Sequence, residues 1–381
     1  GAGGMLKKYA VDQLKEGMVI GQAVHKEDMS VLLGEGTAIN QQMIDSLSEE
    51  KIASVEILEG GEEEAVASAP KAAPEAQGET RKAVPLKEPI LDEGYVKEYA
   101  ACFIELKSLF EVTKAHDSVD KGSAQTLAQN ILPLCSGAKA VAHIHNMAVS
   151  GEYMLHHSLH VAILAGLMGK WLKMPQKDQL RLITAGFLIN IGNVHIEQAM
   201  IEKQGVLTPD ERKIMQRQPQ LGHELIMAGG LGEDEGIAEA VLQYHERNDG
   251  SGYPRGLVKE EIGEFARILA IMDMYDAMAS DRAYAKKRSP FDVFNIMADD
   301  IMKGQLDTDY GFRFIRRVCH DLNGSWVKLS NGEAGKIIYI DESRLAALPV
   351  VQTMDGEFMD LSLRTDVKVE YLLTSREIEE E

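Results

Sequence analysis

The sequence has few cysteines and no excess of positive charge. Its three cysteines, Cys102, Cys135 and Cys319, form no CxxC pair and leave an odd residue, so neither a disulfide framework nor a cysteine zinc site is predicted. Lysine and arginine number 40 against 60 aspartates and glutamates, for a formal net charge of -20. Nucleic acids and anionic membranes would repel such a protein as a whole, which argues against both as partners.

Long apolar runs and common nucleotide or hydrolase motifs are also missing. No stretch is apolar enough to span a bilayer, and the first residues lack the charged-then-apolar pattern of a secretory signal. The phosphate-binding pattern GxxxxGK(S/T) and the nucleophile-elbow pattern GxSxG do not occur. We therefore expect a cytoplasmic protein that belongs to neither of these enzyme classes.

The N-terminal part of the chain divides into a small module and a linker. Residues 5–60 carry short apolar runs between glycines, which predict strands at Gly17–Ile20 and Ser30–Leu33 and a helix from Asn40. Residues 61–88 are rich in Glu, Ala, Pro, Gly and Lys but have almost no large apolar residues. Such a segment cannot bury enough surface to order itself, so it is predicted to be a flexible linker.

The rest of the chain is predicted to be a helical domain followed by a β appendage. Over residues 89–322 nearly all apolar residues recur at helical spacing, and Thr208-Pro209 and Ser289-Pro290 mark helix starts. Over residues 323–375 the period changes to that of short strands separated by Asn-Gly and Asp-Gly turns. The predicted fold class is mainly α, with a small α+β N-terminal module and a small C-terminal β appendage.

One segment of the helical domain carries a distinctive pattern. A helix ends at His245, a glycine-rich turn follows, and the next helix carries Asp273 and Asp276 at i, i+3, which places both carboxylates on one helix face. Turn glycines and aspartates are common, so the spacing alone fits a surface loop equally well.

This segment closely resembles the HD-GYP family of bacterial cyclic-di-GMP phosphodiesterases, whose members share the pattern HHExxDGxGYP and a downstream helix with a metal-binding aspartate. The GYP triplet is present as Gly252, Tyr253 and Pro254. The resemblance runs from about Leu155 to Pro290 and includes His157-Ser158, Thr208-Pro209 and Gln218-Pro-Gln-Leu-Gly. It implies that the helical domain is an HD-type bundle.

The resemblance also implies a metal site, and the sequence departs from it. Family members hold two or three iron or manganese-type ions that activate a water and bind the phosphate of the substrate. Of eight ligand positions implied by the resemblance, His157, His245 and Asp273 keep a ligand, and a further five hold Tyr153, Ile189, Asn190, Gln218 and Tyr244. Because removing even a supporting residue weakens metal binding by roughly 10 to 100-fold, we expect no metal cofactor and no hydrolysis by the family mechanism.

An enzymatic alternative remains open at this point. Three further histidines, His156, His160 and His195, lie near the matched positions and could replace missing ligands. The alternative is a residual metal-dependent phosphodiesterase with iron or manganese at low occupancy in a remodelled site. The competing interpretation is that these histidines are ordinary core or surface residues of amphipathic helices.

Two other features bear on what the domain binds. Arg282 matches a family arginine and Lys286 adds positive charge, which predicts a site for cyclic-di-GMP because guanidinium groups bind phosphate in a bidentate manner. The alternative is a solvated helix end. The family's turn is linked to contacts with diguanylate cyclase (GGDEF) domains, which predicts an interaction surface at Asp249, Gly250, Gly252, Tyr253, Pro254 and Arg255.

Glycines with positive φ would be needed in such a turn whether or not a partner binds it. Weighing the lost ligands against the retained turn, the sequence predicts a catalytically inactive HD-GYP-like signalling protein. We expect it to act as a protein-interaction or cyclic-di-GMP-sensing module and to form a homodimer.

Overall fold

A computed structural model describes residues 5–26, 31–59, 93–146, 152–203, 206–280, 288–344, 347–373, 377–378 and 381. The chain forms two compact units, Gly1–Leu86 with Ile315–Val369 and Lys87–Phe314 with Glu370–Glu381, and each is described by itself. The predicted linker 61–88 and the predicted nucleotide-binding residues Arg282 and Lys286 lie outside the described residues. Among the helices described, none combines the length and apolar character that crossing a membrane requires.

The N-terminal module is built around two strand pairs. Strand β1 (Met5–Ala10) pairs antiparallel with β4 (Ser54–Glu59), and β2 (Val24–His25) pairs with β3 (Val31–Leu33). The strand predicted at Gly17–Ile20 is reduced to isolated bridges at its last two residues. Its first residue adopts a φ of 90°, which interrupts the extended chain.

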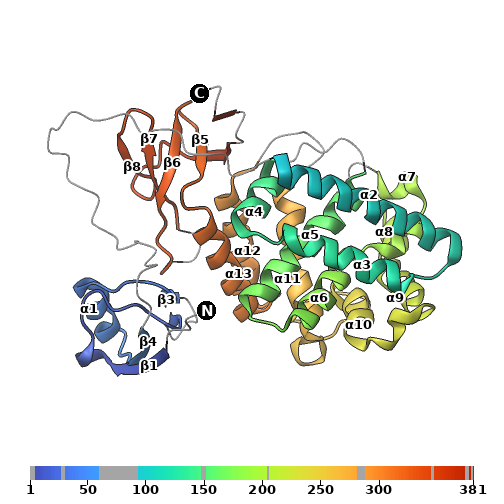
Figure 1. The fold of residues 1–381 in the computed structure, drawn as a ribbon, viewed down its shortest axis with the longest axis horizontal. Coiled ribbons are helices and arrows are strands. Elements are labelled where there is room, and N and C mark those ends of the chain that lie inside the picture. Colours follow the sequence, from blue (N-terminus) through green and yellow to red (C-terminus); the bar gives the residue numbers. More distant parts are fainter. Residues whose placement is uncertain are drawn as a thin grey trace. The chain divides into compact units, whose positions relative to one another are not determined.

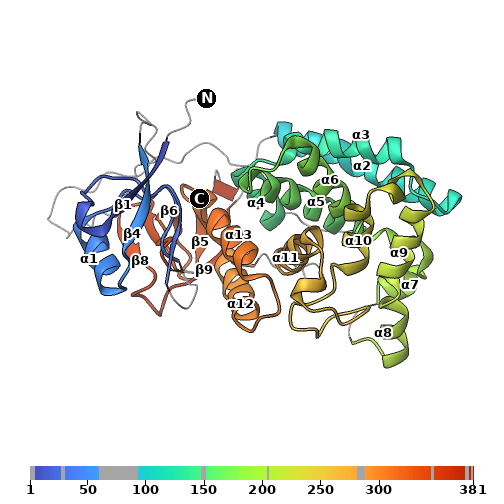
Figure 2. The same ribbon diagram turned by 90° about the horizontal axis from the view of Figure 1, so that it is seen from below.

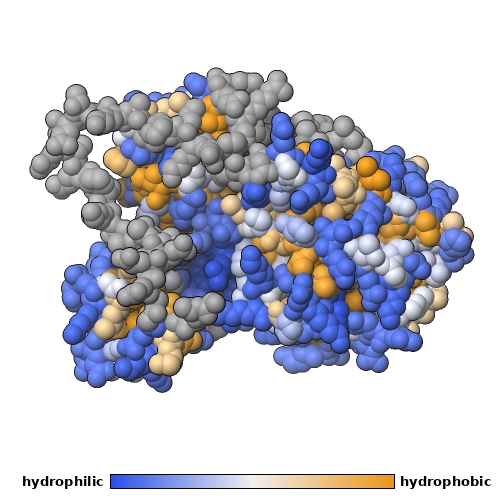
Figure 3. Space-filling view, in the orientation of Figure 1, coloured by the Kyte–Doolittle hydropathy of each residue, from blue (hydrophilic) through white to orange (hydrophobic). Residues whose placement is uncertain are grey.

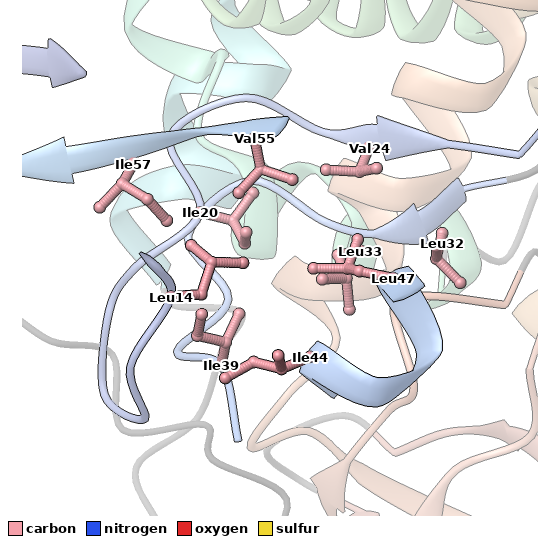
Figure 4. Close-up of a cluster of buried hydrophobic side chains, with 10 residues drawn as sticks. All are labelled: Leu14, Ile20, Val24, Leu32, Leu33, Ile39, Ile44, Leu47, Val55 and Ile57. Atoms are coloured by element: carbon pink, nitrogen blue, oxygen red, sulfur yellow. The ribbon is translucent and has the colours of Figure 1, made fainter. Parts of the chain in front are cut away.

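Helix α1 (Gln41–Glu49) completes the module and begins where the sequence predicts. The side chain of Asn40 caps it by accepting a hydrogen bond from the Met43 backbone N–H at 2.9 Å. Ten buried apolar side chains from α1 and the surrounding strands and loops form one core, which Figure 4 shows: Leu14, Ile20, Val24, Leu32, Leu33, Ile39, Ile44, Leu47, Val55 and Ile57.

The C-terminal strands form one five-stranded sheet in the order β8-β7-β6-β5-β9. Their bounds are β5 (Trp326–Leu329), β6 (Ala334–Tyr339), β7 (Val350–Thr353), β8 (Phe358–Asp360) and β9 (Val369–Leu372). The turns predicted after β5 and β7 contain Gly332 and Gly356, whose φ angles of 88° and 86° favour glycine. Strand β8 lies outside the predicted strand runs because only three residues form it.

The remaining elements are helical, which confirms the predicted mainly α fold class with its small sheets (Figures 1 and 2). The helices are α2 (Glu93–His116), α3 (Lys121–Ile131), α4 (Gly137–Asn146), α5 (Tyr153–Trp171), α6 (Gln176–Leu188), α7 (Gln198–Ile201), α8 (Pro209–Met215), α9 (Gln218–Met227), α10 (Glu235–Gln243), α11 (Glu264–Ala279), α12 (Pro290–Met302) and α13 (Thr308–Asp321). The predicted helix starts at Thr208 and Ser289 both occur, each with a side-chain cap and a following proline.

Helix α5 is the centre of the helical unit. Every residue from His157 to Gly169 is buried, which is the pattern of a helix surrounded by others. Helices α6 and α11 pack against it, and Gly186 of α6 lies so close that a Cβ would stand 2.9 Å from Ala162 Cα. This packing brings the polar face of α11 onto α5, where the candidate site lies.

Candidate functional site

The centre of the candidate site is His157, whose imidazole lies between two carboxylates of α11. Its Nε2 lies 2.6 Å from Asp273 Oδ1 and its Nδ1 lies 2.6 Å from Asp276 Oδ2. The i, i+3 spacing of the aspartates puts both on the helix face that meets α5. The side chains of His157 and Asp276 are almost wholly excluded from solvent, and that of Asp273 is 15% exposed.

Both nitrogens of His157 donate to carboxylates, which requires the charged imidazolium. Burial by itself would lower the pKa of His157, but the hydrogen bonds and negative charges of Asp273 and Asp276 outweigh it and raise that pKa to about 10. The same pairing keeps the pKa of both carboxyl groups below the ordinary value despite their burial. The three side chains therefore form a buried ionic cluster, which we call the α5–α11 clamp.

Asp276 links the clamp to a second histidine. Its Oδ1 accepts from His160 Nδ1 at 2.7 Å and from the Ser280 hydroxyl at 2.7 Å. The sequence placed Asp276 on the same helix face as Asp273 but gave it no ligand role. Its full burial, which only packing reveals, makes it the residue on which both histidines depend.

The positions where the family resemblance implies ligands hold a neutral hydrogen-bond network instead. The Tyr244 hydroxyl lies 3.1 Å from Asn190 Oδ1 and 3.0 Å from Gln218 Oε1, and its single proton is shared between them. The Gln218 amide donates to the Ile189 carbonyl at 2.6 Å, and that of Asn190 lies 3.4 Å from Ser158 Oγ. All these groups are buried, and burial raises the pKa of Tyr244 well above its ordinary value, so the network carries no charge.

These donors do not fit a cluster of iron or manganese ions. Both ring nitrogens of His157 already lie 2.6 Å from carboxylate oxygens of the protein itself. Ile189 has no donor atom, and Asn190, Gln218 and Tyr244 supply no negative charge to offset the ions. Within the described part of the chain, no group of three or more His, Cys, Asp or Glu side chains is arranged to hold a metal ion.

His245, the third position where the sequence keeps a predicted ligand, belongs to an aromatic stack. Its ring lies 4.0 Å from the Tyr244 ring and 4.6 Å from the Tyr253 ring, between centroids, the latter pair at an interplanar angle of 22°. Burial lowers the pKa of His245 to about 4, although the charge of Asp273 opposes the shift. His245 is therefore neutral and packs against the glycine-rich turn rather than joining the clamp by a hydrogen bond.

The glycine-rich turn is organised by Glu246, a residue to which the sequence analysis assigned no role. Its buried carboxylate accepts backbone N–H bonds from Arg255 at 2.7 Å and Leu257 at 2.9 Å. Gly252 lies so close to the preceding segment of the chain that a Cβ on this residue would stand 2.3 Å from the His245 carbonyl oxygen. The adjacent Tyr253–Pro254 peptide bond is cis.

The predicted interaction residues of the turn differ in exposure. Asp249 and Arg255 are exposed, Gly250, Gly252, Tyr253 and Pro254 are partly buried, and Tyr253 turns its ring toward His245. Asp249 Oδ1 accepts from the Ser251 backbone N–H at 3.0 Å, a local turn contact. The interaction role of this surface stays a prediction.

The three histidines considered as substitute ligands do not meet at one point. His160 is hydrogen-bonded to Asp276 of the clamp. His156 Nδ1 instead lies 2.8 Å from the Tyr99 hydroxyl, and the His156 ring stacks on Phe103. His195 pairs with the exposed Asp117 at 3.1 Å. Tyr153, at another implied ligand position, stacks on His157 at 5.7 Å between ring centroids.

The helical unit is similar to known HD domains. Residues 131–309 match the family model described as HD domain. The chain is 28% identical over 236 residues to the cyclic di-GMP phosphodiesterase PA4108 of Pseudomonas aeruginosa, covering 61% of this chain and 55% of that protein. These matches support the predicted HD-GYP resemblance.

Other relatives match shorter or more divergent segments. The response regulator RpfG of Xanthomonas campestris pv. campestris, a cyclic di-GMP phosphodiesterase, is 38% identical over 121 residues, which are 32% of each protein. PdeB of Borreliella burgdorferi is 25% identical over 227 residues, or 58% of each protein. The matched region thus spans a third to three fifths of these relatives. The solved structure of Bd1817 from Bdellovibrio bacteriovorus aligns with 81% of this chain and 98% of its own, at 14% identity and a TM-score of 0.48.

The neutral network predicts the effect of removing its central hydroxyl. Tyr244→Phe keeps the ring but leaves the buried oxygens of Asn190 and Gln218 without their shared donor, so the free energy of unfolding should fall by about 1–3 kcal/mol. Urea unfolding measures this. Tyr310→Phe, which removes a hydroxyl bonded to the surface residue Glu264, is the control and should change stability by less than about 0.5 kcal/mol. Equal effects of the two variants would contradict the network's role.

Two further buried histidines predict acid sensitivity. Burial lowers the pKa of His143 to about 3 and that of His145 to about 4, from 6.5. Between pH 6.5 and 4 the unfolded chain binds protons that the folded chain does not, so stability falls as pH falls. At pH 5 each of these two histidines should lower the free energy of unfolding by about 2 kcal/mol relative to its value at pH 7 or above. The opposite shift of His157 leaves its contribution nearly unchanged throughout this window, because that contribution is complete below pH 6.5 and is lost as the pH rises from 6.5 to about 10.

Urea unfolding at pH 7 and pH 5 checks this prediction. His143→Phe keeps an aromatic ring beside Tyr99, whose centroid lies 4.1 Å from that of His143, and removes the titrating nitrogens. The variant should lose less stability than the wild type between the two pH values. Equal unfolding free energies of the wild type at pH 7 and pH 5 would show that these histidines do not titrate as their burial implies.

Proposed function

We propose that this chain is a catalytically inactive HD-GYP-like signalling protein whose helical unit serves as a protein-interaction or cyclic-di-GMP-sensing module. The observation that carries the proposal is the neutral network of Tyr244, Asn190 and Gln218. These residues occupy three of the positions where the family resemblance implies metal ligands, and they satisfy one another. A site built for several cations needs unsatisfied lone pairs and negative charge in that place.

The α5–α11 clamp supports the same conclusion. His157 of the protein itself supplies a positive charge between the carboxylates of Asp273 and Asp276. The clamp therefore has a structural explanation that requires no ion: it joins two helices of the core by charged hydrogen bonds. The carboxylates are used in holding the bundle together.

The glycine-rich turn supports a binding role at the surface. Glu246 and the close backbone approach at Gly252 order this turn, and His245 supports it by stacking on Tyr253. The turn can thus keep its shape in a domain that has lost hydrolysis, with Asp249 and Arg255 exposed at its rim. We propose this rim as the contact for a diguanylate cyclase (GGDEF) or another signalling protein in the cytoplasm.

Cyclic-di-GMP is the proposed small-molecule ligand because relatives such as PA4108 are phosphodiesterases of that nucleotide. Arg282 and Lys286 are the proposed phosphate contacts. No metal is needed for this recognition, since a guanidinium can bind a phosphate group through two parallel hydrogen bonds.

The first test measures metal and turnover together. Protein purified without chelators should contain far less than one iron or manganese ion per chain by elemental analysis, and it should leave cyclic-di-GMP intact. An active phosphodiesterase of the family is the positive control. Stoichiometric metal together with conversion of cyclic-di-GMP to linear pGpG or GMP would sink the proposal.

The second test separates nucleotide sensing from pure protein interaction. Calorimetry with cyclic-di-GMP should give binding heat for the wild type, and Arg282→Ala should weaken binding by about 10-fold or more, because a charged bidentate contact is lost. Arg364→Ala, at an exposed arginine paired with Asp366, is the matched control and should bind normally. Absence of heat with the wild type would leave the protein-interaction role alone.

The alternative, a residual phosphodiesterase, is favoured by one observation: His157, Asp273 and His245 lie in one region of the bundle and influence one another electrostatically. If this alternative holds, His245→Ala and Asp273→Ala should abolish any hydrolysis that the wild type shows. Unchanged hydrolysis in both variants would exclude a site built from these residues.

A further inference from the structure

Helix α2 buries one apolar face against the helical unit and leaves three large apolar side chains exposed. The covered face consists of Tyr95, Tyr99, Cys102, Leu106, Leu109 and Thr113. Ile104 lies on the face opposite to it and is 69% exposed, and Val96 and Val112, on either side of that face, are 43% and 41% exposed. The sequence predicts a homodimer but does not say which surface forms it.

The exposed face follows a regular line along the helix. At 3.6 residues per turn, positions three or four apart stack on one face. The positions on the line through Ile104 are Glu93, Lys97, Ala100, Ile104, Ser108, Glu111 and Ala115, and all are exposed. The small side chains of Ala100 and Ser108 thus flank Ile104 along the helix, and the oppositely charged Lys97 and Glu111 lie about one turn further out. This arrangement permits a second helix to approach closely at the centre.

The line is self-complementary when read in the opposite direction. In an antiparallel pair of α2 helices related by a two-fold axis at Ile104, each residue faces the one equally far on the other side. Lys97 then faces Glu111, since both lie seven residues from Ile104, and Ala100 faces Ser108 at four residues. Val96 and Val112, eight residues away on either side, flank the contact. A two-fold interface requires this property, because one surface patch must fit itself.

The groove beside this line is the second structural feature. Helices α2 and α3 lie side by side at the outer surface of the helical unit in both ribbon views (Figures 1 and 2). Between them runs a shallow groove lined by Ile104, Ser108 and Val112 of α2 and by Gly122, Ser123 and Thr126 of α3. Hydrophobic patches interrupt the hydrophilic surface over this region in Figure 3. Ridges of a partner helix can pack into such a groove.

We propose that the exposed face of α2 forms a two-fold antiparallel contact with α2 of a second copy of this chain, centred on Ile104. The symmetric placement of Lys97 and Glu111 about Ile104 points to a second copy as the occupant. Two molecules that each carry a net charge of -20 repel, so their contact needs local attraction, and the paired Lys97 and Glu111 supply it twice. Neither residue has an ion-pair partner within the described ranges.

Sedimentation velocity of the full chain over a concentration series tests the proposal. The wild type should be a dimer, and Ile104→Asp should raise the dimer dissociation constant by about 30-fold or more, because two charges would be buried at the axis. Leu363→Asp, at a side chain 80% exposed elsewhere, is the matched control and should remain dimeric. Circular dichroism checks that each variant is folded, as expected for exposed positions.

A charge reversal tests the antiparallel register. Lys97→Glu should weaken the dimer by about 10-fold, because it places two glutamates opposite each other at both ends. Adding Glu111→Lys should restore the wild-type dissociation constant to within about 3-fold, because the opposite charges again face each other. A monomeric wild type, a dimer unaffected by Ile104→Asp, or a double variant as weak as Lys97→Glu alone would each overturn the proposal.

Discussion

The bundle depends on one interaction, the pairing of His157 with Asp273 and Asp276 between α5 and α11. Two carboxylates buried side by side repel each other and lose their hydration, and neither could stay ionised there without a neighbouring positive charge. The imidazolium of His157 supplies that charge and both hydrogen bonds at 2.6 Å. Asp276 in turn orients His160 and Ser280, so a single ion pair organises the polar interior of the helical unit.

The rest of the site follows from how this interior balances its charge. A metal-dependent site leaves carboxylates and imidazoles for the cations to neutralise, whereas here each buried polar side chain of the clamp and the neutral network has a protein partner. The glycine-rich turn is supported from a different direction, by the Glu246 carboxylate beneath it. The turn therefore has support of its own besides the stacking of Tyr253 on His245, so its shape is compatible with the proposed loss of hydrolysis.

The two surfaces proposed for binding serve different roles. The glycine-rich turn lies at the end of α10, close to the clamp, and is proposed to contact a signalling partner. The exposed face of α2 belongs to another part of the helical unit and is proposed to join two copies. A homodimer built through α2 would present two turns at once, which strengthens binding to a partner that is itself multivalent.

The sequence by itself determined the mainly α fold class, several helix starts and the family resemblance. The starts at Asn40, Thr208 and Ser289 are local hydrogen-bonding devices, so neighbouring residues suffice to predict them. It also placed Ile189 and Asn190 at two of the positions where the resemblance implies metal ligands. The protonation of His157, the central role of Asp276 and the support of the turn by Glu246 were decided only by the tertiary structure. Each depends on burial and on contacts between residues far apart in the chain, and sequence spacing records neither.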